Sequence, residues 1–427
     1  MLRILTIILL SLSLNAKDTY TVDELILEAL KNSPTLHVSA SEYKASKSRY
    51  DIAYSDYLPK IDLYLSGGEI GMSDMPANQD MVSDTLILGK LSLKQIVYDF
   101  GRTGGSVDSF KYDSDSYLNS NEQQISDKKR DVKRAYYDVL QSIALIGVND
   151  ENVKLNEIQL YRSKKYFDAG IRTKIDISDA KVELIKSKLD LKKSLYNLKL
   201  SYASLDEVVG FMELDKKYKV YSRELVLETL YSSLSDYSLT LNSAINFAYK
   251  NRYELKKYLS NIQSAKSYTK SAEAQNYPQI YFDVDYTKQH VDKFEVSMPQ
   301  DQWSAALNLD WNIYHGGATT ATIQERRIKI NISQSQLQNS KLSIKKETTQ
   351  AYISVYKMKD SVKLSQSLLE VSKEKFEQAQ KRYEHGLSDY IEIQQARQGY
   401  IDAKSALVVD YYSYYNAIAV LDNAIGK

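Results

Sequence analysis

Two long segments of the chain carry apolar residues at strict intervals of seven. In the second segment these residues are Val355, Val362, Leu369, Phe376 and Tyr383. Moving back 216 positions gives the matching stripe of the first segment: Val139, Ile146, Val153, Leu160 and Phe167. The positions four residues earlier are mostly smaller or polar. Heptads sustained this long predict supercoiled helices. The heptad residues form a strongly apolar stripe, and the positions four residues earlier form a weak one beside it. This combination favours helices that pack side by side in a broad array, with a dimeric coiled coil as the alternative.

A period of two replaces the heptads just before each long helical segment. Apolar residues from Ala305 to Ile313 alternate with polar ones, as do those from Ile280 to Tyr286, and the first half of the chain repeats this more weakly. The alternation predicts four strands, at about residues 60–70, 86–98, 279–290 and 302–314. Such strands with aromatic edges are typical of a transmembrane sheet with a wet inner side. The half-buried sheet of a soluble protein gives the same alternation.

The chain is an internal duplication. Four pairs of residues keep one separation of 216 positions: Tyr98 with Tyr314, Gly101 with Gly317, Gly170 with Gly386, and Gly210 with Gly426. Nearer the start the separation is 219, as between Asn32 and Asn251. We therefore predict a first structural repeat at residues 17–210, a linker at 211–237 and a second repeat at 238–427.

The lengths of the predicted helices fit together. A helix over about residues 102–168 contains no proline and would extend about 100 Å. The returning helix, over about 174–210, covers about half that distance. Helices at about 22–57 and 238–276 would complete the way back to the strands. This layout places the Ser- and Tyr-rich linker at the equator of the helical region.

Four strands are too few for a closed barrel, which needs at least about eight. We therefore expect the chain to oligomerise. Three copies would supply twelve strands around a shared lumen, and two copies would supply eight around a nearly filled one. The number of copies stays open on these grounds.

Composition narrows the location of the protein. Arg3 and the apolar run from Ile4 to Leu14 fit a signal peptide at residues 1–16, with a buried N-terminal helix as the alternative. The run is shorter than the about 20 residues of a membrane-spanning helix. The absence of cysteine excludes a lipid anchor on an N-terminal cysteine and permits an oxidising compartment. A formal net charge of +1 gives no electrostatic case for binding nucleic acid.

The sequence offers no catalytic or cofactor site. The four histidines are scattered without metal-ligand spacing, and no phosphate-binding glycine loop or nucleophile motif occurs. We therefore expect a protein that is not an enzyme and binds no cofactor or metal. Energy for any transport would come from a partner.

Two pairs of motifs make the chain similar to a known family. The strand-to-helix junctions read QIVYDFGRT (95–103) and WNIYHGGAT (311–319), and the helix turns read FDAGIRTKIDISDA (167–180) and YEHGLSDYIEIQQA (383–396). In each turn an aromatic residue is followed by a glycine three positions later, an acidic residue six after that, and an alanine four further on. With these motifs and this helix layout, the chain resembles the TolC family of bacterial outer membrane efflux proteins over almost its whole mature length.

The resemblance implies a mostly helical protomer with four transmembrane strands. A homotrimer would form a 12-stranded β-barrel in the outer membrane of a Gram-negative bacterium, in contact with outer membrane lipid and continuous with a periplasmic α-helical barrel. It would dock to a periplasmic adaptor (membrane fusion) protein and an inner-membrane transporter, as the exit duct of efflux or type I secretion. An exported coiled-coil scaffold without channel activity is the alternative hypothesis. A passive porin is disfavoured because its long helices would have no purpose.

The resemblance also implies roles for the residues of the junctions. The transition from barrel to tunnel is expected at Tyr98, Phe100, Gly101, Tyr314, Gly316 and Gly317. Glycine tolerates backbone angles there that residues with a Cβ resist, and the aromatic rings would lie near the inner membrane interface.

At the turns, the resemblance implies an entrance and a docking surface. The matching entrance positions are Asp176, Asp179, Glu392 and Gln395. Arg172, with Arg382 as a second candidate, would form salt bridges that hold the entrance shut. Gln395 departs from the family, where a second acid is expected. Acids in the first turn of a helix also have the simpler role of offsetting its dipole. The adaptor is expected to contact Gly170, Ile171, Arg172, Gly386, Leu387 and Ser388.

Overall fold

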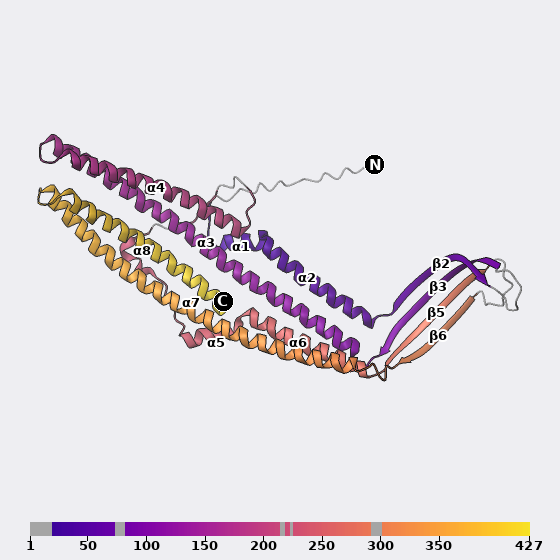
Figure 1. Cartoon of the computed structure of the whole chain (residues 1–427). Helices are drawn as coiled ribbons and strands as arrows, with labels where there is room; N and C mark the ends of the chain where they lie inside the picture. The colour runs from indigo at the N-terminus through magenta and orange to yellow at the C-terminus, as the bar shows by residue number, and fades with distance from the viewer. Residues whose placement is uncertain (1–18, 73–81, 214–217, 223–224, 292–300) are drawn as a thin grey trace, which may run out of the picture. The chain divides into compact units, whose positions relative to one another are not determined.

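The computed structural model of the chain describes residues 19–72, 82–213, 218–222, 225–291 and 301–427 (Figure 1). The expected signal peptide at residues 1–16 lies outside the described residues. Internal contacts divide the chain into two compact units. Of the described residues, those within 19–37, 124–252 and 343–427 form the first unit, and those within 38–123 and 253–342 form the second.

The duplication is reproduced in the bounds of the helices. One hairpin consists of α3 (Arg102–Asp168) and α4 (Lys174–Val209), and the other of α7 (Ala318–Glu384) and α8 (Tyr390–Ile425). Every bound of the second hairpin lies 216 positions after its counterpart. The shorter helices repeat at 219 positions: α1 (Val22–Asn32) and α2 (Pro34–Tyr54) match α5 (Leu241–Asn251) and α6 (Tyr253–Glu273). The protomer is therefore mostly helical and built from two structural repeats.

The helices that lead into the sheet are interrupted, whereas we expected continuous helices over about 22–57 and 238–276. Pro34 has no N–H for the helix ladder and disfavours helical angles at the residue before it. Accordingly Ser33 is extended, at φ −68° and ψ 117°. Arg252 is extended without a proline, at φ −62° and ψ 125°. Its buried guanidinium donates to Glu347 Oε2 at 2.5 Å, which ties the break to α7.

A four-stranded antiparallel sheet belongs to the second unit. Its strands are β2 (Lys60–Met72), β3 (Val82–Tyr98), β5 (Gln279–Val291) and β6 (Asp301–Asp310). They are hydrogen-bonded in the order β2-β3-β5-β6. The central pair joins the two repeats, with Leu93 opposite Val284. The edge strands of this sheet are therefore β2 and β6.

The last strand is shorter than expected. The alternation predicted a strand over about 302–314, but β6 ends at Asp310. The next residue, Trp311, turns its indole Nε1 to the carbonyl oxygen of Asn276 at 3.0 Å. Ile313 and Tyr314 beyond it are 81% and 84% exposed. Tyr314 therefore follows the sheet rather than ending it.

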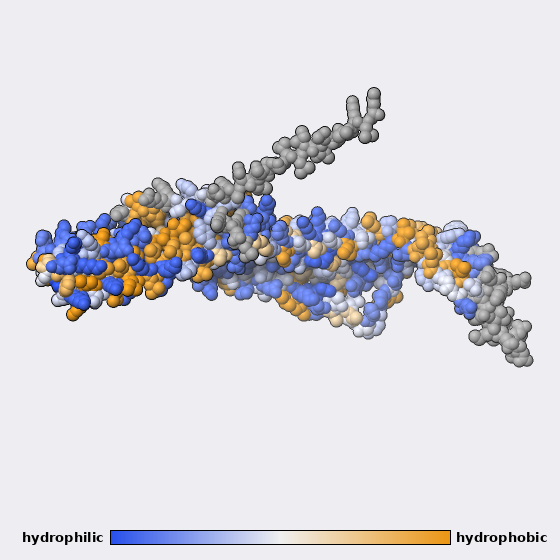
Figure 2. All heavy atoms as spheres, turned by 90° about the horizontal axis from the view of Figure 1, so that it is seen from above, coloured by the Kyte–Doolittle hydropathy of each residue, from blue (hydrophilic) through white to orange (hydrophobic). Residues whose placement is uncertain are grey.

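The apolar face of the sheet is more exposed than its polar face. Leu63, Leu307 and Trp303 are 67%, 68% and 75% exposed, whereas Asp283 and Asp285 on the other face are half-buried. Figure 2 shows apolar residues at the molecular surface over both the sheet and the helices. A soluble antiparallel sheet packs its apolar face on a core. Among the described residues, no element covers the apolar face of this one.

In the first unit the long helices lie side by side in the order α4, α3, α8 and α7 (Figure 1). Ser142 of α3 bonds to Ser201 of α4 at 2.8 Å. Asn416 of α8 donates to Asp138 of α3 at 2.9 Å, and Ser365 of α7 donates to Asp410 of α8. These contacts give the broad array that the paired stripes predicted, rather than a two-helix coiled coil.

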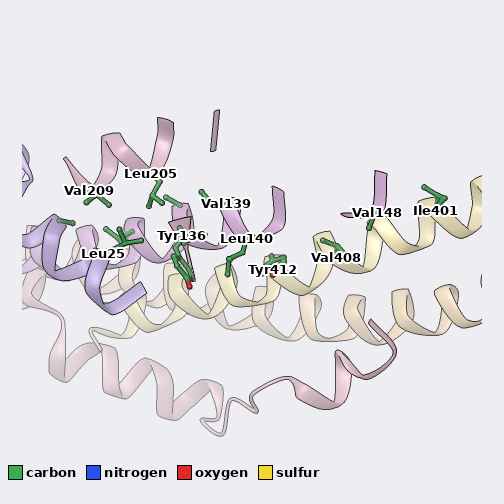
Figure 3. Close-up of a cluster of buried hydrophobic side chains, with 14 residues drawn as sticks. Leu25, Tyr136, Val139, Leu140, Val148, Leu205, Val209, Ile401, Val408 and Tyr412 are labelled. Atoms are coloured by element: carbon green, nitrogen blue, oxygen red, sulfur yellow. The ribbon is translucent and has the colours of Figure 1, made fainter. Parts of the chain in front are cut away.

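The core of the first unit draws side chains from α1, α3, α4 and α8. Leu25, Val139, Leu205 and Val408 are each at most 1% exposed (Figure 3). Part of the weak stripe of α3 is buried as well: Asn156 and Ser163 are 3% and 0% exposed, and Ser187 on the facing helix α4 is 2% exposed. Small side chains along this seam let the two helix axes approach.

Over the described residues, every helix falls short of the length or the apolar character that a membrane span requires.

The linker is fastened to the first unit. The phenol of Tyr136 on α3 donates to the carbonyl oxygen of Tyr221 at 2.6 Å. Gln366 of α7 accepts the N–H of Tyr231 at 2.9 Å. The linker contains one short strand, β4 (Lys219–Val220), which pairs in parallel with β1 (Thr19–Tyr20). It also contains two 3-10 turns, at Leu227–Thr229 and Tyr231–Ser233.

Gly210 is expected to be critical for the docking of α4 on α1. It ends α4 at φ +85°, and a Cβ there would lie 2.9 Å from the carbonyl oxygen of Asn32. We expect Gly210→Ala to lower the free energy of unfolding by about 1–3 kcal/mol, because it adds backbone strain and a steric clash. The midpoint of thermal unfolding, followed by circular dichroism, measures the effect.

Gly399→Ala is the matched control for this substitution. Gly399 lies inside α8 with nothing within 4 Å of an added Cβ, and alanine favours a helix over glycine by about 1 kcal/mol. The midpoint should stay unchanged or rise. Equal losses in the two variants would contradict the prediction.

Candidate functional site at the helix turns

The two helical hairpins turn in the same way. Gly170 and Gly386 adopt φ of +72° and +73°, which glycine reaches without the strain of a Cβ. The N–H groups of Gly170 and Ile171 donate to carbonyl oxygens of the last turn of α3, at 2.9 and 2.8 Å. Gly386 and Leu387 repeat both bonds on α7. Each turn thus closes its helix with paired backbone bonds and leaves Ile171 and Leu387 62% and 70% exposed.

The returning helices begin with different caps. Asp389 precedes α8 and accepts the N–H of Glu392 at 2.9 Å. Thr173 precedes α4, and its hydroxyl donates to Asp176 Oδ1 at 3.2 Å instead of capping the backbone. Asp176 and Glu392 therefore lie in the first turns of α4 and α8, where the positive end of the helix dipole stabilises a carboxylate.

Arg172 connects the two hairpins. Its Nη2 donates to the carbonyl oxygen of Ser388 in the other turn at 2.6 Å. Its guanidinium carbon also lies 4.7 Å from the centre of the Tyr383 ring on α7. A cation–π contact of this kind contributes about 0.5–2 kcal/mol, depending on its exposure to water. One side chain of the first turn thus holds both the backbone and a buried ring of the second.

Tyr383 lies in a small core between the hairpins. It is 1% exposed and packs with Ala180, Tyr390 and Ile393. Burial raises the pKa of Tyr383 above its ordinary value, although the Ser163 hydroxyl and the Arg172 guanidinium act to lower it. The phenol is therefore neutral at physiological pH, and its attraction to Arg172 comes from the ring face rather than from an ion pair.

The expected entrance residues have different surroundings. Asp179 and Gln395 are exposed, whereas Asp176 and Glu392 are half-buried. Glu392 forms an ion pair with Arg382 of its own hairpin at 3.2 Å. A second ion pair near the turns joins Arg162 of α3 to Glu384 at the end of α7, at 2.8 Å. Arg172 instead contacts a carbonyl oxygen and a ring.

Sequence reasoning assigned no role at the turns to Tyr383, Tyr390 or Arg397. The heptad stripe includes Tyr383 and signals its burial, but not its contact with the other hairpin. Arg397 is 3% exposed, whereas Lys181 at the matching position of the first repeat is exposed. Burial raises the pKa of Tyr390, and the neighbouring Arg397 acts to lower it. The local sequence does not distinguish the buried Arg397 from the exposed Lys181.

The strand-to-helix junctions differ between the repeats. Left-handed backbone angles occur at Phe100 (φ +56°), Gly101 (+92°), Gly316 (+57°) and Gly317 (+82°). Phe100 matches Gly316, and a residue with a side chain at this angle costs about 1 kcal/mol or more. The ring of Phe100 stacks on Tyr277 at 5.2 Å and meets Tyr98 edge-on at 4.6 Å. These aromatic contacts offset the strain of the backbone.

Asp99 fastens the first junction. It is 8% exposed, its Oδ2 accepts the N–H of Thr103 at 2.6 Å, and its Oδ1 accepts that of Gly101 at 3.1 Å. Asp99 thus satisfies free donors at the start of α3. The matching residue of the second junction is His315, whose carbonyl oxygen accepts the N–H of Ala318 at 3.0 Å. Sequence reasoning missed Asp99, although an aspartate just before a helix is a recognisable capping signal.

The chain matches known proteins over nearly its whole length. The family model described as "Outer membrane efflux protein" matches residues 25–211 and 244–427. The probable efflux pump outer membrane protein TtgC and the antibiotic efflux pump outer membrane protein ArpC, both from Pseudomonas putida, are each 19% identical over 414 residues, which cover 95% of this chain and 82% of the relative.

Solved structures share the fold. The outer-membrane channel OprN superposes with a TM-score of 0.82 at 14% identity, covering 95% of this chain and 89% of that one. The CmeC outer membrane channel of Campylobacter jejuni gives a TM-score of 0.82 at 17% identity, with coverage of 95% and 85%.

Replacing Arg172 should loosen one turn from the other. The chain has no cysteine, so spin labels on the pair Ile171→Cys and Leu387→Cys report the distance between the two turns. We expect Arg172→Ala to broaden this distance distribution in electron–electron double resonance, because it removes both contacts to the second hairpin.

Arg382→Ala is the matched control, since it removes an ion pair within one hairpin. Its distance distribution should match that of the labelled parent. A distribution that stays equally narrow without Arg172 would show that the turns are held together by other contacts.

Proposed function

Because the chain belongs to the outer membrane efflux protein family, we propose that it is the exit duct of a tripartite efflux or type I secretion system. Three copies form a homotrimer in the outer membrane of a Gram-negative bacterium. Their twelve strands close into one barrel, and their long helices form a tunnel through the periplasm. The relatives named as outer membrane proteins of efflux pumps support this role.

The observation that carries this proposal is the state of the sheet. Its apolar face is exposed, as Leu63 and Leu307 illustrate, and lipid is the environment in which such a face is stable. The edge strands β2 and β6 present backbone donors and acceptors that must be satisfied inside a membrane. Pairing β6 of one copy with β2 of the next satisfies these groups and leaves no edge.

The edges of the helical array support the same ring. On α4, the exposed residues Ile175, Val182 and Leu189 recur at intervals of seven. On α7, Ile353 and Leu364 are 57% and 69% exposed. Because α4 and α7 lie at opposite edges of one array, α4 of one copy packs on α7 of the next in a head-to-tail ring. We infer three copies because eight strands would leave a nearly filled lumen.

The helix turns are the proposed docking surface for the partners. A periplasmic adaptor (membrane fusion) protein contacts the two turns and couples the duct to an inner-membrane transporter. Exposed Ile171 and Leu387 supply apolar contact area, and Gly170 and Gly386 leave the backbone of each turn accessible. Arg172 and Ser388 fix the relative position of the two turns.

The same turns form the proposed entrance. Asp176 and Asp179 of the first repeat, with Glu392 and Gln395 of the second, surround the tunnel axis in a trimer. A ring of carboxylates at a constriction attracts cations. Asp179 is exposed, whereas Arg382 neutralises Glu392, so the first repeat supplies the larger share of the charge.

The junctions carry the chain from barrel to tunnel. Gly101, Gly316 and Gly317 provide the backbone angles of the bend. The rings of Tyr98, Phe100 and Tyr314 are exposed and lie at the inner interface of the membrane, where aromatic side chains are favoured.

The alternative, an exported helical scaffold, leaves the sheet unexplained. A scaffold in water would bury Leu63 and Leu307 rather than expose them. It would also dissolve without detergent, which the duct does not.

Charge at the turns should control ion flow through the duct. We expect the detergent-purified protein to give small, cation-selective currents in planar bilayers. Asp176→Ala/Asp179→Ala should change the conductance and the cation preference by at least about two-fold, because it removes charge from the constriction.

Asp190→Ala is the control, since Asp190 is an acid on α4 that pairs with Lys193 away from the turn, at 3.1 Å. Its currents should equal those of the parent. Unchanged currents in the double variant would show that Asp176 and Asp179 do not form the entrance, and Glu392 would be tested next. Protein that is soluble without detergent and gives no current would refute the duct.

A further inference from the structure

Two lysines of β3 lie beside the acids of β5 on one face of the sheet. Lys94 is opposite Asp283 in the strand register, and Lys90 Nζ lies 3.2 Å from Asp285 Oδ1. Lys94 Nζ lies 4.1 Å from the centre of the Tyr281 ring. Asp283 also accepts a hydrogen bond from Asn308 of β6. The two acids are therefore not a free negative patch.

This face is the polar one. Side chains alternate along a strand, so positions 90 and 94 share a face with 283 and 285, and Val284 and Tyr286 point to the other. Charged residues on the described part of the polar face are Lys60, Lys90 and Lys94 against Asp62, Asp283, Asp285 and Asp310. Without Lys90 and Lys94, this face would be strongly acidic.

The two amino groups are held at the sheet rather than free in solution. The ion pair with Asp285 positions Lys90, and the ring of Tyr281 positions Lys94. Fixed charges on the wall of a pore act on ions that pass within about 8 Å of it, which is the screening length in physiological salt. The lysines can therefore decide which sign of charge passes.

We propose that Lys90 and Lys94 determine charge selectivity in the sheet-level part of the duct. They offset Asp283 and Asp285, so that anionic and zwitterionic substrates pass this stretch as well as cationic ones. This inference rests on the proposed function, since it takes the polar face as the wall of the lumen.

The test is the reversal potential of single channels in a potassium chloride gradient. Lys90→Gln/Lys94→Gln is measured in the wild type and in the Asp176→Ala/Asp179→Ala background, where the turns contribute less charge. We expect the permeability ratio of potassium to chloride to rise by about two- to five-fold, because the acids are no longer offset. Asp283→Asn/Asp285→Asn should shift the ratio in the opposite direction.

Lys288→Gln is the matched control. Lys288 lies on β5, on the apolar face, and pairs with Asp301 at 3.5 Å. Its removal should leave the ratio unchanged. If Lys90→Gln/Lys94→Gln gives intact currents and an unchanged permeability ratio in both backgrounds, the inference is overturned and the proposed duct is not. A wild-type protein without any current would overturn the duct, and the inference with it.

Discussion

The structure depends on the open edges of a four-stranded sheet. Strands β2 and β6 have a neighbour on one side only, and the apolar face between them is exposed. Among the described residues, no further element of the chain pairs with these edges or covers this face. Closure with further copies corrects both, and it requires the neighbouring copies to meet along the helices as well. In the proposed ring, the exposed apolar residues of α4 and α7 would be covered by the same closure that pairs the strand edges.

The two repeats share their backbone geometry and differ in their polar contacts. Gly210 and Gly426 both end a helix in the left-handed conformation and both lie against the end of a shorter helix, at Asn32 and Arg252. A Cβ would lie 2.9 Å from the nearest atom at Gly210 and 3.0 Å at Gly426, so crowding and the left-handed backbone both favour glycine at these places. Polar contacts are less constrained: Asp99 caps α3 while His315 stands at its place in the second repeat. The two turns of the protomer are thus unlike, and only the first carries Arg172.

The periodic part of this architecture could be predicted from the sequence. The heptads predicted the helical hairpins, and the alternation of apolar and polar residues predicted the strands. Both predictions work because an element buried on one face carries apolar residues at a regular spacing along the sequence. The breaks were harder. Pro34 signals the end of α1, but Arg252 ends α5 through an ion pair with a distant helix, and β6 stops where Trp311 bonds outside the sheet. At the turns, the acids could be located because they belong to a repeated sequence motif. No sequence motif indicates that Arg172 donates a hydrogen bond to the carbonyl oxygen of Ser388.

Charge on the sheet follows from strand register rather than from local sequence. Asp283 and Asp285 in isolation suggest a lining that favours cations. Register adds Lys90 and Lys94 from a strand about two hundred residues away. The ion pair shows that Lys90 reaches Asp285, while Lys94 lies over the Tyr281 ring. An exit duct takes its cargo from the pump that it serves, so a strongly charged wall would restrict what that pump could export. In the proposed duct, a nearly balanced wall would remove this restriction, and charge would then act on substrates mainly at the acids of the turns.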